Sequence, residues 1–273
     1  MRDEASEPPS APGSLELRGV SVRFATASGS YTAVGGVTID VRRGEFVSIV
    51  GPTGSGKSTL LNVAAGLLAP AEGEVRVSGR PLAGVNREAG YLFQADALMP
   101  WKDALGNVAV GLEVQGVARP EARRRAEEWL GRVGLKGFGD RYPHQMSGGM
   151  RKRTALAQML IRDPPILLMD EPFSALDIQT RHLMENQLLE LWSGDRKSVL
   201  FITHDLEEAI SLSDRVLLLS AGPAARLIGE YAVPLPRPRD VAEIRMTDSF
   251  LDLHRAIWAD LRAEVQKAYA HAR

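Results

Sequence analysis

Short runs of apolar, β-branched residues recur along the chain, and each is followed by a polar or glycine-rich turn. Residues 46–50, 166–169 and 198–202 have the length and composition of buried parallel strands. Residues 15–41 and 74–80 instead alternate apolar and polar positions, which is typical of antiparallel strands. The pattern predicts an α/β fold in which a parallel core is joined to an antiparallel β-lobe.

Between Gln94 and Ile166 the strand pattern gives way to a helical one. Helices are predicted over residues 103–114, 120–133 and 147–161. The second begins with a proline, which suits the first turn of a helix because its missing N–H would have no partner there. A helical stretch therefore interrupts the sheet.

The two ends of the chain differ in composition from its middle. Residues 1–14 are rich in Pro, Ser and Glu and lack an apolar core, so a disordered N-terminal tail is predicted there and not a signal peptide. Residues 234–239 form a proline-rich linker, and apolar residues at helical spacing over 250–265 predict a final helix. That helix either covers apolar surface of its own domain, the interpretation that we favour, or makes a regulatory or dimer contact.

A glycine-rich loop connects the strand at 46–50 to a helical pattern. It comprises Gly51, Pro52, Thr53, Gly54, Ser55, Gly56, Lys57, Ser58 and Thr59. The glycines let several backbone N–H groups face one anion, and the helix N-terminus adds partial positive charge. We expect Lys57 to reach the β- and γ-phosphates of a nucleotide and the Ser58 hydroxyl to bind Mg²⁺. A chance match is disfavoured because a strand precedes the loop and a helix follows it.

Two adjacent carboxylates, Asp170 and Glu171, end the strand at 166–169. Open α/β sheets bind their ligands at the carboxyl ends of the strands. Asp170 is expected to hold Mg²⁺ through water, and Glu171 to polarise a water that attacks the γ-phosphate. A solvated acidic turn is the alternative, and the phosphate loop makes it the weaker one.

A Ser-Gly-Gly sequence at Ser147, Gly148 and Gly149 begins the helix at 147–161. With this addition, residues 15–230 resemble the ATP-binding subunits of ABC (ATP-binding cassette) transporters. The remaining motifs follow in the same order as in that family. They are Phe93-Gln94, similar to the Q-loop; Ser174-Ala175-Leu176-Asp177, similar to the D-loop; and Thr203-His204-Asp205, similar to the switch histidine.

The resemblance implies a P-loop NTPase (RecA-like) core with an antiparallel β-lobe and an inserted helical subdomain at about residues 95–163. The ATPase domain would span 15–233, and 234–273 would hold the linker and the last helix. ATP and Mg²⁺ are the implied cofactors, and Gln94 would reach the metal or the attacking water. An aromatic residue of the β-lobe would stack on adenine: we choose Phe24, which precedes the small residues 25–30, and Tyr31, which follows them, is the alternative.

Cassettes of this family work as head-to-tail dimers. The resemblance therefore implies that Ser147, Gly148 and Gly149 of one copy close on the γ-phosphate held by a second copy, with Asp177 contributing from the D-loop. His204 would contact the γ-phosphate and orient the attacking water. Ser147 is also a typical helix N-cap, and the two glycines leave N–H groups bare for an anion.

A narrower resemblance is to the nitrate/sulfonate/taurine-type importers. It depends on Met150 in the signature sequence, on the segment from Gln94 to Trp101 and on the tail near residues 236–254. Residues 98–101 form an apolar cluster, and we expect a helix of the permease to dock on it. The alternative is that these side chains cover the hydrophobic core of their own helical subdomain.

Composition limits the remaining possibilities. The 273 residues are 44% hydrophobic, carry a formal net charge of −1 and include no cysteine. The sequence has no stripe of basic residues of the kind that binds nucleic acid. No apolar run reaches the roughly 18 residues that a membrane span needs. Together with the absence of such a run, the resemblance implies a peripheral subunit at the cytoplasmic face of the cell membrane. Its implied partners are a membrane permease and, through it, a periplasmic or extracellular solute-binding protein. A soluble ABC ATPase of cofactor assembly is the alternative.

Overall fold

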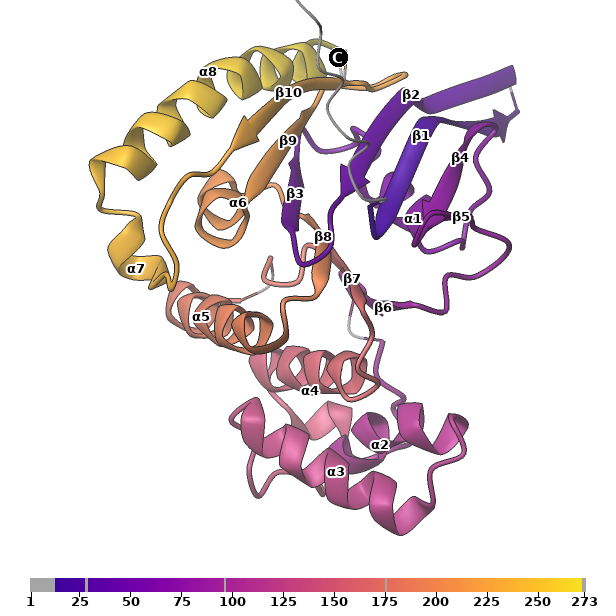
Figure 1. The fold of residues 1–273 in the computed structure, drawn as a ribbon, viewed down its shortest axis with the longest axis vertical. Coiled ribbons are helices and arrows are strands. Elements are labelled where there is room, and N and C mark those ends of the chain that lie inside the picture. Colours follow the sequence, from indigo (N-terminus) through magenta and orange to yellow (C-terminus); the bar gives the residue numbers. More distant parts are fainter. Residues whose placement is uncertain (1–12, 28, 96, 175, 272–273) are drawn as a thin grey trace, which may run out of the picture.

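The computed structural model describes residues 13–27, 29–95, 97–174 and 176–271 (Figure 1). The predicted N-terminal tail lies outside these ranges, apart from its last two residues. Ser14 is buried, and its hydroxyl donates to the carbonyl of Val41 at 3.1 Å. Ser14 therefore belongs to the folded part of the chain, contrary to the predicted boundary at residue 14.

The core is a six-stranded sheet of order β10-β9-β3-β8-β7-β6. Its strands are β3 (Phe46–Val50), β6 (Ala89–Leu92), β7 (Ile166–Asp170), β8 (Ser198–Ile202), β9 (Arg215–Leu219) and β10 (Leu227–Ala232). All neighbouring pairs are parallel except β9 and β10. Every residue of β3, β7 and β8 is buried, which explains their continuous apolar runs and confirms the predicted parallel core.

A second sheet of order β2-β1-β4-β5 is antiparallel throughout. It consists of β1 (Leu15–Thr26), β2 (Gly29–Val41), β4 (Glu72–Val77) and β5 (Arg80–Pro81). Helix α1 (Lys57–Ala64) contacts β1 and β2 on one side and β7 and β8 on the other. The two sheets thus share α1 (Figure 1), and the phosphate loop at its start contacts β2 of one sheet and β9 of the other.

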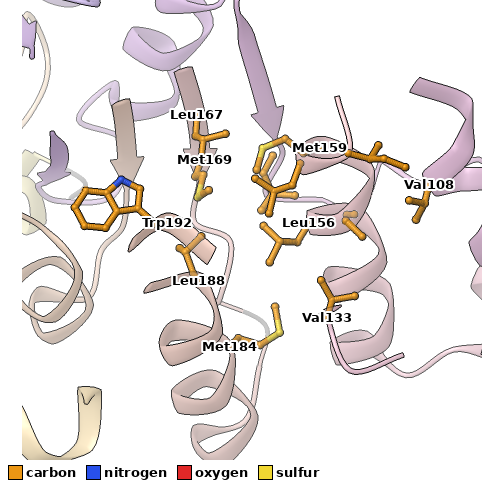
Figure 2. Close-up of a cluster of buried hydrophobic side chains, with 14 of the residues drawn as sticks. Val108, Val133, Leu156, Met159, Leu167, Met169, Met184, Leu188 and Trp192 are labelled. Atoms are coloured by element: carbon orange, nitrogen blue, oxygen red, sulfur yellow. The ribbon is translucent and has the colours of Figure 1, made fainter. Parts of the chain in front are cut away.

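The chain leaves the core after β6 and forms α2 (Ala104–Val114), α3 (Arg119–Arg132), the 3₁₀ turn η1 (Pro143–Gln145) and α4 (Gly148–Leu160). These helices match the predicted ones to within two residues at each end. They lie at one end of the molecule (Figure 1). Figure 2 shows how they join the core: Leu156 and Met159 of α4 share one apolar cluster with Leu167 and Met169 of β7.

Helix α5 (Ile178–Asp195) follows β7 and packs Trp192 against Phe46 of β3. Helix α6 (Leu206–Leu212) follows β8 and contacts β3 and β9. The chain ends with α7 (Val241–Ile244) and α8 (Asp248–His271), which passes along α6 and the β9–β10 edge of the sheet (Figure 1). Phe250, Ile257 and Leu261 bury the apolar stripe of α8 against this edge. The final helix therefore covers its own domain, as the favoured prediction states. None of the helices within the described ranges is long and apolar enough to cross a membrane.

Candidate nucleotide-binding site

The loop between β3 and α1 needs glycine at two positions for steric reasons. Gly56 has φ +86°, and a Cβ there would lie 2.6 Å from Cγ1 of Val34. At Gly51, a Cβ would lie 2.7 Å from the carbonyl oxygen of Leu219 on β9. The loop is thus pressed against β2 on one side and β9 on the other, so its backbone can turn inward only without side chains at these points.

Lys57 begins α1, and its side chain is folded into the loop. Its Nζ donates to the carbonyls of Gly51 and Pro52, each at 2.9 Å. Burial lowers the pKa of Lys57, while the negative charges of Glu171 and Asp170 oppose this shift. A nearly buried ammonium group beside the first turn of a helix makes the loop a site for an anion.

The next residue links the loop to the neighbouring strand. The Ser58 hydroxyl donates to Oδ1 of Asp170 at 3.0 Å, across 112 positions of sequence. Burial raises the pKa of Asp170, and the hydrogen bond from Ser58 and the charge of Lys57 counteract this. Hydroxyl and carboxylate oxygens are the donors that Mg²⁺ prefers, so this pair fits the metal. The Ser55 hydroxyl also fits a bound polar group, since it is buried without a hydrogen-bond partner in the described part of the chain.

Glu171 has a left-handed backbone, φ +43°, which is uncommon for a residue with a side chain. Its N–H donates to the carbonyl of Ile202 at 2.9 Å, so the turn is fixed by the adjacent strand β8. Oε2 of Glu171 accepts a hydrogen bond from Nε2 of Gln94 at 3.0 Å, and Nδ1 of His204 lies 3.1 Å from the same atom. Two of the predicted catalytic side chains, Gln94 and His204, therefore converge on one oxygen of the third.

These groups face one open cavity of about 480 Å³. Its lining comprises Phe24, Tyr31, Ala33, Thr53, Gly54, Gly56, Lys57, Ser58, Thr59, Gln94, Glu171 and His204. Phe24 and Tyr31 are register partners on β1 and β2, and each is 40% exposed. Directly opposed residues of an antiparallel pair share a face, so both aromatic candidates stand at the same wall of the cavity. The remaining loop residues, Gly51, Pro52 and Ser55, do not line it.

The signature and D-loop residues do not line this cavity either. Ser147 caps α4 and accepts from the N–H of Met150 at 3.3 Å, and Gly148 and Gly149 follow in its first turn. Asp177 caps α5 and accepts from the N–H of Thr180 at 3.0 Å, an interaction that lowers the pKa of Asp177. Ser147 and Asp177 are both exposed. Within one chain they are separate from the phosphate loop, as a head-to-tail arrangement requires.

Lys152 of α4 is a site residue that the sequence analysis did not single out. It is buried, and its Nζ donates to the carbonyls of Phe93 at 3.3 Å and Gln94 at 2.5 Å. The helix that begins with the signature sequence thus holds the backbone that carries Gln94. Lys152 lies four and seven positions before the buried Leu156 and Met159, so helical spacing places it on the core face. A lysine on that face is the signal that could have identified it.

Comparisons with known proteins agree with this geometry. Residues 34–174 match the family model described as ABC transporter. An uncharacterised ABC transporter ATP-binding protein of Methanocaldococcus jannaschii, MJ0412, is 41% identical over 93% of each chain. The taurine import ATP-binding protein TauB of Burkholderia pseudomallei is 41% identical over 91% of this chain and 96% of its own.

Solved structures support the same assignment. A dimer of the ATP-binding cassette MJ0796 in a post-hydrolysis state with ADP and Pi superposes with a TM-score of 0.74 at 32% identity, over 81% of this chain and all of that one. This confirms the P-loop NTPase fold. The chain belongs to the ABC transporter family, as an ATP-binding cassette that hydrolyses ATP.

Proposed function

We propose that this cassette energises an importer for nitrate, a sulfonate, taurine or a related small solute. The observation that carries the proposal is the cavity lined by Lys57, Ser58 and Glu171, whose Ser58 hydroxyl is hydrogen-bonded to Asp170. Import is supported by the similarity to taurine import ATP-binding proteins. A role in cofactor assembly has no comparable support.

The triphosphate of ATP would lie on the loop and the first turn of α1, with the adenine against Phe24 and Tyr31. Lys57 would exchange its two carbonyl acceptors for phosphate oxygens, which bind an ammonium more strongly. Ser58, Asp170 and Gln94 would hold Mg²⁺, which neutralises charge on the phosphate oxygens when bound. Gly54 and Gly56 keep this surface free of side chains, so backbone N–H groups can approach the phosphates.

Glu171 would act as the general base. Its carboxylate would take a proton from the attacking water as the water oxygen bonds to the γ-phosphorus and the bond to the β–γ bridging oxygen breaks. Gln94 and His204 both reach Oε2, so they orient the carboxylate toward that water. His204 is exposed and would also contact the γ-phosphate.

The site would be completed by a second copy of the chain. Ser147, Gly148 and Gly149 offer the N-terminus of a helix of thirteen residues, a suitable partner for a phosphate. Because they lie outside their own chain's cavity, they are available to the partner's nucleotide. Asp177 would contribute from the same surface. Such an arrangement makes hydrolysis depend on dimer closure.

The permease would dock beside Gln94. A hollow of about 230 Å³ lies between β6, α2 and α4, and Phe93, Ala97 and Met159 are among its lining residues. Trp101 is 74% exposed nearby in sequence. Leu98, in contrast, packs against the apolar core, so the predicted docking cluster is divided and only part of it faces solvent. Exposed aromatic residues beside a hollow suit a helix of a membrane partner.

The test is reconstitution at a membrane. The cassette is co-expressed with a candidate permease of this importer class, and the purified complex is reconstituted in liposomes with the matching solute-binding protein. We expect ATP hydrolysis to rise when nitrate, taurine or an alkanesulfonate is supplied with that protein, and Trp101→Glu to abolish co-purification while the free cassette still binds ATP. Failure of the native chain to associate with any permease would contradict the importer role and favour the soluble alternative.

A further inference from the structure

The loop between β9 and β10 extends from the core sheet toward the other lobe. Residues 220–226, here called the β9–β10 loop, are closed at their base because the N–H of Ser220 donates to the carbonyl of Arg226 at 2.8 Å. The Ser220 hydroxyl accepts from the N–H of Arg226 at 3.0 Å. These two hydrogen bonds hold the ends of the loop together and so fix its orientation relative to the sheet.

The tip of this loop pairs with β2. The N–H groups of Ala224 and Ala225 donate to the carbonyls of Thr32 and Ala33 at 2.7 and 3.1 Å, and Ala225 accepts from Gly35 at 3.0 Å. Thr32 and Ala33 directly follow Tyr31 on the strand. The loop therefore supports the segment of β2 that carries one aromatic wall of the nucleotide cavity.

The same loop also reaches the phosphate loop. A Cβ placed on Gly222 would lie 3.3 Å from the carbonyl oxygen of Gly54 and 3.3 Å from the hydroxyl oxygen of Tyr31. Gly54 and Tyr31 both line the cavity. Gly222 is thus packed against the turn that would bind phosphate and against the ring that would face adenine.

The C-terminal helix fixes this loop through one carboxylate. Glu264 of α8 is buried, and its Oε2 accepts from the N–H of Ala221 at 2.8 Å. Its Oε1 accepts from Lys267 one turn later at 2.5 Å. Burial raises the pKa of Glu264, but the hydrogen bonds from Lys267 and Ala221 outweigh this and lower the pKa. An ionised acceptor makes the bond to Ala221 a charge-assisted one.

We propose that Glu264 is a positioning residue for the nucleotide: through Ala221 it holds the β9–β10 loop against Gly54 and Tyr31, which makes the C-terminal helix a structural part of the ATP site. This rests on the proposed function in that it assigns ATP to the cavity. It goes beyond that function because no described residue of α8 is among those that line the cavity, and the favoured expectation for this helix was that it covers apolar surface.

The test compares MgATP binding to the full-length chain by calorimetry. Glu264→Ala should raise the Kd three- to tenfold, and kcat at saturating ATP should stay within twofold, since the reacting groups are untouched. Glu264→Gln should remain within twofold of the parent for Kd, because its amide oxygen can still accept from Ala221. Asp260→Ala is the matched control. It removes the hydrogen bond that Tyr231 of β10 donates to α8, without touching the loop.

Equal losses in the Asp260→Ala and Glu264→Ala variants would mean that α8 acts only through stability and would overturn the proposal. So would a Glu264→Ala chain that binds like the parent. Lys57→Ala is run alongside: if it too binds like the parent, the nucleotide assignment itself is wrong. Should Glu264→Ala not fold, hydrogen exchange of the native chain decides. MgATP should slow exchange across residues 220–226 as well as in the phosphate loop; protection of the phosphate loop alone would refute the proposal.

Discussion

His204 Nδ1 lies 3.1 Å from Oε2 of Glu171, the same oxygen that accepts the hydrogen bond of Gln94. The two side chains come from the ends of different strands, and Glu171 itself is held in a left-handed turn. Such a backbone costs on the order of 1–3 kcal/mol and persists only where surrounding structure fixes it. The carboxylate is therefore oriented before any water arrives.

Replacement of the base should separate binding from hydrolysis. Glu171→Gln keeps the shape and the contact to Gln94 but cannot take a proton, so hydrolysis should fall by about 10²- to 10⁴-fold. Calorimetry should show MgATP affinity within a few-fold of the parent, and size-exclusion chromatography should show a dimer trapped by ATP. Glu207→Gln, an exposed carboxylate on α6, is the control. Parental turnover in the Glu171→Gln variant would exclude Glu171 as the base.

Lys57→Ala should instead weaken binding. The variant removes the cation nearest the loop, and a lost charge-assisted bond of about 1.5–3 kcal/mol corresponds to a roughly 10- to 100-fold rise in Kd for MgATP. Lys136→Ala removes an exposed lysine of the helical segment and should bind as the parent does. Calorimetry measures both. A Lys57→Ala chain with parental affinity would place the triphosphate elsewhere.

Local patterns predict this fold well where one segment determines its own structure. The strand, loop and helix around Lys57 are contiguous, and burial on both faces of β3 leaves a clear apolar run. The contacts that complete the site are not local. Lys152 meets the Gln94 carbonyl across 58 positions, and Phe24 faces Tyr31 only because of strand register. No propensity encodes such approaches, since tertiary packing alone brings the segments together.

A similar limit applies beside His204. Asp205 and Glu208 have the spacing of a capping box, in which each side chain binds the other's backbone N–H. Asp205 does accept from the N–H of Glu208 at 3.3 Å, but the Glu208 carboxylate accepts from the Thr203 hydroxyl at 2.7 Å instead. The N–H of Asp205 donates to that same hydroxyl at 2.9 Å. A reciprocal capping box therefore does not form, because the buried Thr203 supplies a competing partner.

Lys152 should affect turnover more than binding. Lys152→Met keeps the apolar stem and removes the ammonium that holds the carbonyls of Phe93 and Gln94. If these hydrogen bonds contribute about 1–2 kcal/mol to holding Gln94 in its reactive position, their loss should lower kcat about five- to thirtyfold. The Kd for ATP should change little. Lys152→Gln, which still carries donors, should recover part of the rate, whereas Lys136→Met should have no effect. Equal changes in Kd and kcat would indicate a purely structural role.

Glu208 should give the fold a pH dependence. Burial raises its pKa to about 7, although the hydrogen bond from Thr203 opposes this. In the unfolded chain the group ionises near its ordinary pKa of about 4.3, so the folded state binds more protons between about pH 4 and 7. The contribution of Glu208 to the free energy of unfolding therefore falls as pH rises through this window, by on the order of 1–3 kcal/mol.

Glu208→Gln stays neutral at every pH and can still accept from Thr203. Relative to the parent, it should become progressively more stable in urea unfolding as pH increases from 5 to 8. Glu207→Gln, the exposed neighbour, should follow the parental profile. A difference between Glu208→Gln and the parent that is independent of pH would show that Glu208 is ionised in the fold throughout this range.

Complementation between two damaged chains tests the dimeric site. Lys57→Ala damages the phosphate loop, and Ser147→Arg places a bulky cation at the start of α4; alone, each should lose most activity. In a mixed dimer, one site combines the intact loop of the Ser147→Arg chain with the intact signature of the Lys57→Ala chain. The other site carries both defects. A purified mixed dimer should therefore recover up to about half of the parental ATPase rate if its two sites turn over independently.

Two measurements make that result decisive. Differently tagged chains show by tandem affinity purification that mixed dimers form in the presence of ATP, and each mutant mixed with itself under the same tags gives the baseline. Because Ser147 lies outside its own chain's cavity, rescue requires the signature of one chain to serve the nucleotide of the other. Mixed dimers that form without any gain in rate would mean that each chain completes its own site, which contradicts the head-to-tail arrangement.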